Sequence, residues 1–390
     1  MSLLRRSVSL GDVSPGDRPL RRSGGPAVTS TSALRQSVVW ASCRLRADLI
    51  SMMPIDVYRR SKAAGINVPV STPPVLVNPT EVADGHPMAI AEWMYSGQMS
   101  LDRGGNNIGV IRKVDAFGLP AQIDLVSLDD VTMRVKGGRI TEYRINGEKH
   151  ETRHIWHERQ HTVAGVPIGL SPVAYAALHL AGAQAAAEFA VDWFVNGAVP
   201  SAILKNEEKV LDPLNAERTK RRFLASTRAG EPFVTGKDWS YNAISAKAAE
   251  AAFIEQMQYS DVALARFYGV PGDLVDVAVN SSTINYANIT QRNLQLLIMN
   301  LGAPVKRRED ALERLTPSSQ FVKLNRDVIL AMDAKSRAEL FKAQIDSRTR
   351  TPDQVRAIDD LLPLSDADYA QFERLWPART PNQPQTSGGN

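Results

Sequence analysis

The stretch from Gly169 to Gly197, GLSPVAYAALHLAGAQAAAEFAVDWFVNG, predicts one long helix. Ser171 suits the N-cap because its hydroxyl can accept a backbone N–H bond, and Pro172 suits the first helical position because its missing N–H costs nothing there. Asn196-Gly197 is a typical helix end. About 25 residues at 1.5 Å each give a rod of roughly 35–40 Å. Its many alanines leave little side-chain bulk, so we expect neighbouring helices to pack closely against it.

A second long helix is predicted over 245–268, and the two helices flank an inserted island at 199–242. Within the island, Ala202–Leu204 and Pro232–Thr235 are predicted strands, and Leu214–Ala225 is a short charged helix between them. The second helix carries one face of mainly apolar residues, namely Phe253, Met257, Ser260, Leu264 and Phe267. Helix, island and helix therefore follow one another in the chain.

The segment after the second helix begins with a loop. Val270-Pro271 ends the helix, and residues 272–283 contain no Lys or Arg. A third helix is predicted from Thr283 towards Leu315, with a kink near Leu301 because Pro304 removes a backbone hydrogen bond. The predicted elements that finish the fold are a strand at Phe321–Leu324 and helices at Ala334–Ile345, Pro352–Asp360 and Asp366–Leu375.

The N-terminal part of the chain has a different pattern. Thr31 or Ser32 can cap a helix that runs to about Met53 and stops before Pro54, and the strand Ile55–Tyr58 follows. Gly137-Gly138 and Asn146-Gly147 are strong hairpin turns. Further strands are predicted at Asn106–Val114, Gln122–Ser127, Val131–Val135 and Thr141–Ile145. The fold class is therefore α+β.

The composition is that of a globular protein with two or three domains. The 390 residues include 46 Lys+Arg and 42 Asp+Glu, so the net charge of +4 is a weak argument for nucleic-acid binding. A single cysteine rules out a disulfide scaffold and fits a reducing compartment. The N-terminus lacks the apolar region of a signal peptide. The most apolar stretch, 173–195, is interrupted by polar residues, so we expect a soluble, intracellular protein.

Two local features at the N-terminal end carry less specific information. Residues 1–30 are rich in Ser, Gly, Pro and Arg with a local charge of +3, counting five arginines and two aspartates, which predicts a flexible basic tail. That tail is either a solvated terminus or an arm for nucleic acid or a partner. Cys43, in the middle of the first helix, is predicted to be a buried apolar residue.

The sharpest match to a catalytic motif is His157-Glu158-Arg159-Gln160-His161. In H-E-x-x-H, two histidines on adjacent helical turns hold zinc and the glutamate acts as general base, so a zinc metallohydrolase using His157, Glu158 and His161 is an alternative function. That chemistry requires a helix. The hairpin turn upstream and Gly165-Val166-Pro167 downstream leave no room for one, so a strand with incidental histidines is favoured.

A basic run, Arg218, Lys220, Arg221 and Arg222, lies in the inserted island. It is either a solvated helix face or a surface for an acidic partner or DNA phosphates. Other enzyme motifs are missing from the sequence: Gly236-Lys237 lacks the spacing of a phosphate-binding loop, and Ser171 is followed by proline, unlike a nucleophile elbow. These absences agree with what the resemblance described next implies, namely no enzyme activity and no cofactor.

Over roughly residues 33–376 the chain resembles the HK97-type portal proteins of tailed bacteriophages, through the order and spacing of several segments. The most specific are Gly169-Leu170-Ser171-Pro172 and Phe194-Val195-Asn196-Gly197-Ala198-Val199-Pro200-Ser201. The others begin at Val38, Met53, Tyr58, Gly105, Leu128, Ala265, Ser281, Thr351 and Leu361.

The resemblance implies a portal architecture and gives the expected domains their names. Between a basic tail at 1–30 and a disordered tail at 377–390, these are a wing at 31–170, a first stem helix at 171–198, a clip at 199–243, a second stem helix at 244–270, a tunnel loop at 271–283, a kinked helix with the return to the wing at 284–332, and a crown at 333–376.

The implied role is structural. Such proteins form a ring, expected to be a dodecamer, at one capsid vertex of the virion, where it is the channel for packaging and ejection of double-stranded DNA. The expected partners are the terminase large subunit, later the head–tail adaptor, and the major capsid protein, with assembly in the host cytoplasm and no membrane. The basic run would be the part of the clip that docks partners. Another head–tail structural protein remains an alternative, although adaptors are usually shorter chains.

Ring symmetry makes a prediction for the channel, because every residue that faces the bore is repeated in each subunit. Tight phosphate binding would stall sliding DNA, and the tunnel loop has no basic residue. We expect loose DNA contacts from Asp276, Val277, Ala278, Val279, Asn280, Ser281 and Ser282. The alanine-rich stem helix and Leu294–Leu301 are expected to be buried between subunits.

Overall fold

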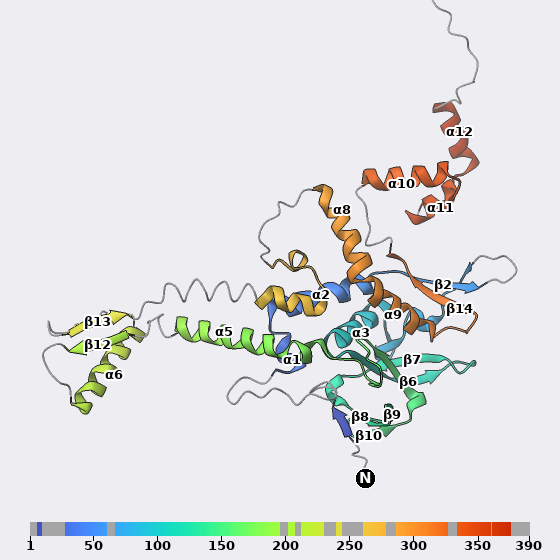
Figure 1. Ribbon diagram of the computed structural model, residues 1–390. Coiled ribbons are helices and arrows are strands. Elements are labelled where there is room, and N and C mark those ends of the chain that lie inside the picture. Colours follow the sequence, from blue (N-terminus) through green and yellow to red (C-terminus); the bar gives the residue numbers. More distant parts are fainter. Residues whose placement is uncertain are drawn as a thin grey trace, which may run out of the picture. The chain divides into compact units, whose positions relative to one another are not determined.

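The structure is a computed structural model that describes residues 6–9, 28–60, 67–195, 202–206, 212–229, 239–243, 260–277, 286–326, 334–359 and 361–375 (Figure 1). The chain divides into two compact units, Met1–Ile329 and Leu330–Asn390. Helices and small antiparallel sheets are mixed along the chain, so the predicted α+β class is confirmed.

The first predicted helix consists of two pieces, α1 (Ser30–Ala33) and α2 (Ser37–Ser51). The N-cap is Thr29, not Thr31 or Ser32: the Ser32 N–H donates to the Thr29 hydroxyl at 3.0 Å, and the Thr29 N–H donates to the Ser32 hydroxyl at 2.9 Å. Gln36 has extended backbone, which separates the two pieces. Cys43 is fully buried in α2, as predicted, and burial raises the pKa of its thiol.

Strand β2 (Ile55–Arg60) is the centre of a sheet that joins distant parts of the chain. It pairs antiparallel with β3 (Asn67–Val70) and with β14 (Gln320–Leu324), where Val57 faces Val322. The predicted strands at 55–58 and 321–324 are thus confirmed and lie side by side. A short helical turn η1 (Pro74–Leu76) and the hairpin β4 (Thr80–Ala83) and β5 (His86–Met88) follow β3.

Helix α3 (Ile90–Gly104) was not predicted from the sequence. Trp93, Met94 and Leu101 are buried along one face of it, and Gly105 ends it in the left-handed conformation with φ 72°. Strand β6 (Asn106–Val114) follows directly and has the predicted bounds. It is the middle strand of a sheet with β11 (Ile155–Arg159) and β7 (Pro120–Leu125).

A second sheet has the order β1 (Arg6–Ser9), β8 (Val131–Lys136), β9 (Arg139–Ile145) and β10 (Glu148–His150). The two predicted hairpin turns join β8 to β9 and β9 to β10, and Gly137, Gly138, Asn146 and Gly147 have positive φ. The short turns η2 (Leu128–Asp130) and η3 (Thr152–His154) flank this sheet in the chain. Residues 6–9 were predicted to belong to a flexible tail. They instead form β1, which pairs antiparallel with β8 at the edge of the sheet. Residues 1–5 and 10–27 lie outside the described part.

The helix predicted to follow Ser171 begins as expected. The Ser171 hydroxyl accepts the Ala174 N–H at 3.2 Å, and Pro172 opens α4 (Pro172–Tyr175). After a turn at Ala176 the chain continues as α5 (Ala177–Val195), while Asn196-Gly197 lies outside the described residues. A Cβ on Gly169 would lie 1.9 Å from the Gly105 carbonyl oxygen. A Cβ on Gly105 would likewise lie 2.2 Å from the Leu170 carbonyl oxygen, so both Gly169 and Gly105 must be glycine. The start of α4 therefore lies directly against the end of α3.

Part of the second long helix predicted from the sequence is described, residues 260–268. Leu264, Ala265 and Tyr268 pack with α2 and with Leu180 of α5 in one apolar core. The helix ends where Val270-Pro271 predicts it, with Gly269 at φ 62°. The rest of the predicted helix, 245–259, lies outside the described residues.

The inserted island contains β12 (Ala202–Asn206), α6 (Pro213–Ala229) and β13 (Trp239–Ala243), and the two strands pair antiparallel. The strand predicted at 232–235 lies outside the described residues. The strand that the structure shows begins later, at an alternation of aromatic and polar residues in Trp239-Ser240-Tyr241-Asn242.

The chain around the predicted kink changes its helical hydrogen bonding. After η4 (Gly272–Val275), it forms α8 (Tyr286–Gln295), a π-helical turn η5 (Leu296–Asn300) and α9 (Gly302–Glu313). The Leu301 N–H donates to the Leu296 carbonyl at 2.9 Å, which is the wider π pattern. The irregularity lies one turn before Pro304, whose missing N–H leaves the helix weakened there.

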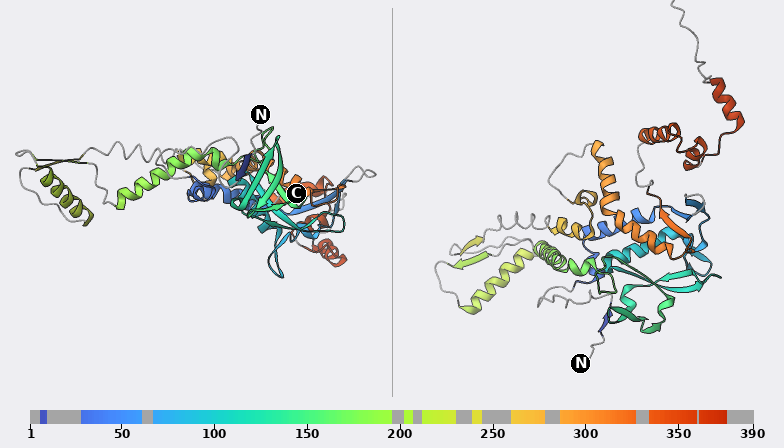
Figure 2. Two further views of the ribbon diagram at one scale, coloured as in Figure 1. Left: turned by 90° about the horizontal axis from the view of Figure 1, so that it is seen from below. Right: turned by 45° about the vertical axis from the view of Figure 1, so that its right-hand side comes forward.

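The second compact unit contains α10 (Ala334–Asp346), α11 (Pro352–Ile358) and α12 (Asp366–Leu375), coloured orange to red in Figures 1 and 2. All three helices were predicted. A capping box between Thr351 and Gln354 begins α11. Residues 376–390 lie outside the described part. No helix among the described residues is long and apolar enough to span a membrane.

Candidate functional site

The H-E-x-x-H sequence lies on a strand and the turn that follows it. Because side chains alternate along β11, His157 and Glu158 are on opposite faces of the sheet. His161 comes after the strand, at φ 52°. The two histidines are therefore not on adjacent turns of one helix, which contradicts the zinc metallohydrolase alternative. No group of three His, Cys, Asp or Glu side chains in the described residues is placed to hold a metal.

Both ring nitrogens of His157 are engaged. Nδ1 lies 2.9 Å from the Tyr143 hydroxyl, and Nε2 lies 3.0 Å from Oδ1 of Asn106. An amide oxygen only accepts, so Nε2 carries the hydrogen and Nδ1 accepts from Tyr143. Burial, together with the nearby Arg159 and Arg314, lowers the pKa of His157 to about 3. This histidine is therefore a neutral, buried side chain between β6, β9 and β11.

The pKa of His157 predicts a loss of stability in acid. In the unfolded chain a histidine has a pKa near 6.5, so between pH 6.5 and about 3 the unfolded state binds more protons. The free energy of unfolding is expected to fall by about 2 kcal/mol from pH 7 to pH 5 through this group. Denaturant unfolding at the two pH values should show a smaller difference for His157→Gln than for the parent chain. Equal differences would contradict the assignment.

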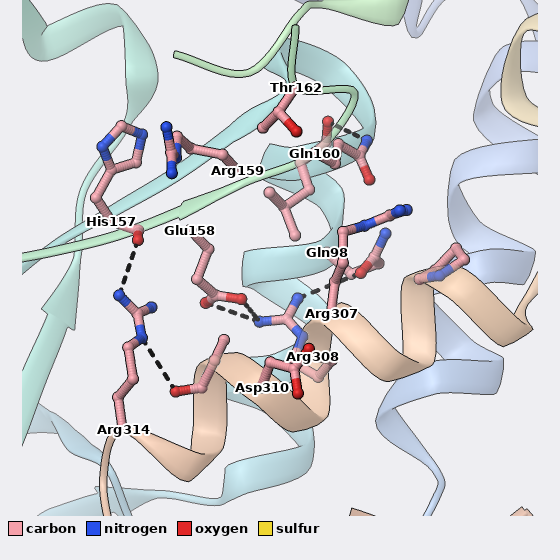
Figure 3. A pocket seen from close by; sticks show the side chains of 13 residues that line it. Gln98, His157, Glu158, Arg159, Gln160, Thr162, Arg307, Arg308, Asp310 and Arg314 are labelled. Carbon is pink, nitrogen blue, oxygen red and sulfur yellow. Dashed lines mark hydrogen bonds and ion pairs between the residues drawn. The ribbon is translucent and has the colours of Figure 1, made fainter. Parts of the chain in front are cut away.

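Glu158 forms a buried ion pair instead of acting as a base. Nη1 of Arg308 lies 2.9 and 2.8 Å from the two carboxylate oxygens, and the two side chains are 1% and 5% exposed (Figure 3). The indole N–H of Trp156 donates to Oε1 at 2.8 Å, and Nδ2 of Asn107 donates to the same oxygen at 2.9 Å. The carboxylate therefore links β11, β6 and α9 through these hydrogen bonds and the ion pair.

The polar network continues from Arg308 to the end of the second stem helix. Nη2 of Arg308 donates to Gln98 at 3.3 Å, and Gln98 donates to Asp102 at 3.0 Å. Arg46 pairs with Asp102 at 3.1 Å and donates to the Tyr268 carbonyl at 2.8 Å. Because that carbonyl is among the last of the helix, Arg46 acts as its C-terminal cap. Helices α2 and α3 therefore hold the C-terminal end of the helix at 260–268.

Two of the predicted channel residues are described. Asp276 is in the left-handed conformation at φ 54° and exposed, and Val277 packs on the core shared by α2 and α5. Ala278, Val279, Asn280, Ser281 and Ser282 lie outside the described residues.

The chain on both sides of the predicted tunnel loop is held together. Asp273 forms an ion pair with Arg292 of α8, and Nδ2 of Asn300 donates to the Gly269 carbonyl at 2.6 Å. The base of the loop is fixed at two points.

The predicted clip residues Arg218, Lys220, Arg221 and Arg222 are all exposed on α6. Lys220 and Arg221 lie 3.8 and 3.4 Å from the carboxylate of Glu217. Within the described residues, Arg218 and Arg222 have no ion-pair partner. The run therefore lies on the exposed surface of α6, and the charges of Arg218 and Arg222 are not neutralised by an ion pair within the described residues.

Sequence reasoning did not find the partners in the buried network. Arg308 and Glu158 are 150 positions apart, and Asp102 and Arg46 are 56 apart. A weak signal was present: Arg46 and Asp102 stand among mainly apolar residues of their helices, and a charge in such a place needs a partner.

The fold matches solved portal structures. A crystal structure of an HK97 family phage portal protein from Corynebacterium diphtheriae aligns with a TM-score of 0.61 and 15% identity, covering 80% of this chain and all of that one. The neck of a native gene transfer agent particle, computed with C12 symmetry, aligns with a TM-score of 0.55 and 18% identity, covering 87% and 95%. The chain therefore shares the fold of these solved structures.

The sequence comparisons give the family. The family model of phage portal proteins matches residues 37–360. The portal protein of Enterobacteria phage HK97 is 28% identical over 385 residues, covering 94% of this chain and 89% of that protein. The probable portal protein of Streptomyces phage phiC31 is 27% identical over 369 residues, covering 88% and 78%. The chain belongs to the phage portal protein family, which confirms the predicted resemblance and makes it a portal protein of a tailed phage.

Proposed function

We propose that copies of this chain close into a dodecameric ring at one capsid vertex, and that the ring conducts double-stranded DNA during packaging and ejection. The role is that of a conduit, and family membership implies a structural protein rather than an enzyme. The proposal is supported most directly by two apolar helix faces that the single chain leaves in water.

The first face lies at the start of the proposed first stem helix, where Tyr175 and Leu178 are 52% and 64% exposed. The second lies on the π-helical turn, where Ile298 and Met299 are 59% and 77% exposed. Two different patches on one subunit suit a heterologous interface, in which one face of each copy meets the other face of the next and the ring closes. Burying each side chain contributes about 1.5–3 kcal/mol.

A charge on the second face is expected to prevent ring formation. The double variant Ile298→Asp, Met299→Asp would place two carboxylates in a desolvated contact, so purified protein should shift from rings to monomers. Light scattering after size-exclusion chromatography measures the mass. Val82→Asp, at an apolar residue of β4 that is 65% exposed, is the matched control and should leave rings intact. Rings of unchanged mass from the double variant would remove this face from the interface.

The tunnel loop is proposed to line the narrowest part of the bore. It has acidic Asp273 and Asp276 and no basic residue, so it would surround DNA without neutralising phosphates. The proposed channel contacts are those expected from the sequence, from Asp276 to Ser282. Arg46 and the Asp273–Arg292 pair would hold the loop base against the wing as DNA moves.

The island is proposed to be the clip that docks partners outside the capsid. Its exposed run from Arg218 to Arg222 suits an acidic surface. The terminase large subunit would bind there during packaging and the head–tail adaptor afterwards, while the wing would meet the major capsid protein. The ring would assemble in the host cytoplasm and remain in the virion. The relatives with solved structures include parts of a gene transfer agent neck.

A further inference from the structure

One basic residue stands close behind the proposed tunnel loop, which itself has none. Arg292 lies on α8 (Figure 1) and is the only Lys or Arg between Arg266 and Lys306 in the sequence. In a ring around DNA this residue would be repeated in every subunit beside the bore. A free positive charge at such a place binds phosphates. The fate of this one charge therefore matters for a channel through which DNA has to slide.

The structure pairs Arg292 with Asp273, on the other flank of the loop. Nη1 of Arg292 contacts a carboxylate oxygen of Asp273, and this ion pair joins α8 to η4. Among the described residues Arg292 has no second ion pair. The two side chains are 38% and 21% exposed, so the pair lies at the surface. Without Asp273 the guanidinium group would be open to solvent and to an anionic ligand.

Apolar packing anchors the segments that carry the two partners. On the η4 side, Leu274, Val275 and Val277 pack against the core that α2 and α5 share. On the α8 side, Leu296 and Leu297 are buried in the π-helical turn that follows. The carboxylate and the guanidinium group are therefore presented to each other from two anchored segments.

A second contact, without charge, joins the same two flanks. Nδ2 of Asn300 donates to the Gly269 carbonyl at 2.6 Å. An exposed ion pair adds little to the stability of a fold, because water and salt screen it. The apolar packing and the Asn300 bond hold most of the loop base, so the charges of the pair need a further explanation.

The charge balance of the segment supplies that explanation. Between Arg266 and Lys306 the chain carries two aspartates, Asp273 and Asp276, and one arginine, which gives a formal charge of −1. In the described structure Asp276 forms no ion pair with Arg292, so Asp273 alone neutralises it. A neutral residue at position 273 would leave one unpaired cation in every subunit.

We propose that Asp273 neutralises Arg292 so that the channel does not bind DNA tightly. A guanidinium group engaged by a carboxylate has fewer donors left for a phosphate, whereas a free one can bind phosphate through two parallel bonds. Asp273 is thus a positioning residue that acts through Arg292. The inference rests on the proposed ring around DNA and adds to it one carboxylate that lets the duplex slide.

Packaging assays with Asp273→Asn rings test this role. Asparagine keeps the size of the side chain and removes its charge, and it is expected to slow packaging about threefold or more at low salt, with partial rescue by added salt. Arg292→Gln removes the cation and should package near the parent rate. The double variant, Asp273→Asn with Arg292→Gln, should also package near the parent rate because no free cation remains.

Binding of a short DNA duplex to purified rings measures the same effect without the motor. Asp273→Asn rings are expected to bind the duplex more tightly than parent rings and to lose affinity more steeply as salt rises, while the double variant matches the parent. Asp310→Asn is the matched control, because it frees Lys306 from an exposed ion pair on α9, and its packaging rate should not change. Circular dichroism and ring mass show that each variant is folded and assembled.

The variants separate charge neutralisation from a purely mechanical role of the pair. If Asp273→Asn and Arg292→Gln slow packaging equally and the double variant is no faster, the pair serves only to tie the flanks together, and the proposal is overturned. Slow packaging by Asp310→Asn, to the same degree as by Asp273→Asn, overturns it as well.

Comparison with Asn280→Lys separates this proposal from the proposed channel. If Asn280→Lys slows packaging and Asp273→Asn does not, the loop lines the bore but Arg292 does not reach the DNA, and only the role of Asp273 is overturned. If neither variant slows packaging by intact rings, the placement of the loop is wrong and the role of Asp273 is overturned with it.

Discussion

Replacing Arg308 by methionine is expected to lower the free energy of unfolding by about 3–5 kcal/mol. The substitution leaves Glu158, 5% exposed, as a lone buried carboxylate at the junction of β11, β6 and α9. Its remaining donors, Trp156 and Asn107, are neutral. An unpaired buried charge is among the few single changes that cost this much.

Denaturant unfolding followed by far-ultraviolet circular dichroism measures the loss. Arg153→Met is the matched control, because Arg153 and Glu151 form an ion pair with side chains 74% and 64% exposed; the loss there should stay below about 1 kcal/mol. The double variant Glu158→Gln, Arg308→Met removes both charges and should recover part of the stability. A loss below about 1 kcal/mol for Arg308→Met alone would contradict the role of this pair.

Replacing Asn280 by lysine is expected to slow DNA packaging about tenfold or more while rings still form. In the proposed channel every copy adds one positive charge around the duplex, and each neutralised phosphate adds salt-dependent affinity that resists sliding. Asn280 lies outside the described residues, so the prediction rests on the loop composition and on the proposed portal role. Ser281→Lys should behave alike.

Packaging assays with purified rings and empty capsids test this directly, read as DNA protected from nuclease over time. Asn280→Gln is the control, since it changes length without charge and should package near the parent rate. Raising the salt concentration should partly rescue the lysine variant because it screens the phosphate contact. Packaging at the parent rate by intact Asn280→Lys rings would refute the placement of the loop.

Local sequence signals predicted the elements that depend on local chemistry. Ser171-Pro172 begins a helix, the Gly137-Gly138 turn joins two strands, and Pro304 lies next to an irregular helical turn. These features could be predicted because helix caps, positive φ and a missing N–H act within a few residues of the chain. Helix α3 was overlooked although Trp93, Met94 and Leu101 fall on one of its faces. It lacks a side-chain N-cap, so the usual start signal was missing.

The candidate sites likewise contain features that local sequence predicts and features that it does not. The strand environment of His157 followed from its flanks, and the structure confirms it. The pairing of Glu158 with Arg308 joins residues 150 positions apart, and the cap that Arg46 gives to Tyr268 joins residues 222 positions apart. Such contacts are set by tertiary packing, which no local pattern reports. The overall net charge of +4 likewise conceals how unevenly the arginines gather in the fold.

The central claim is that this chain assembles into a ring around a channel. Native mass spectrometry of the purified full-length protein at micromolar concentration, with electron microscopy of the same sample, tests it most directly. We expect a closed ring of identical subunits, a dodecamer in the mature assembly, with a central hole wide enough for duplex DNA. A stable, folded monomer under these conditions, with no ring in the images, would contradict it.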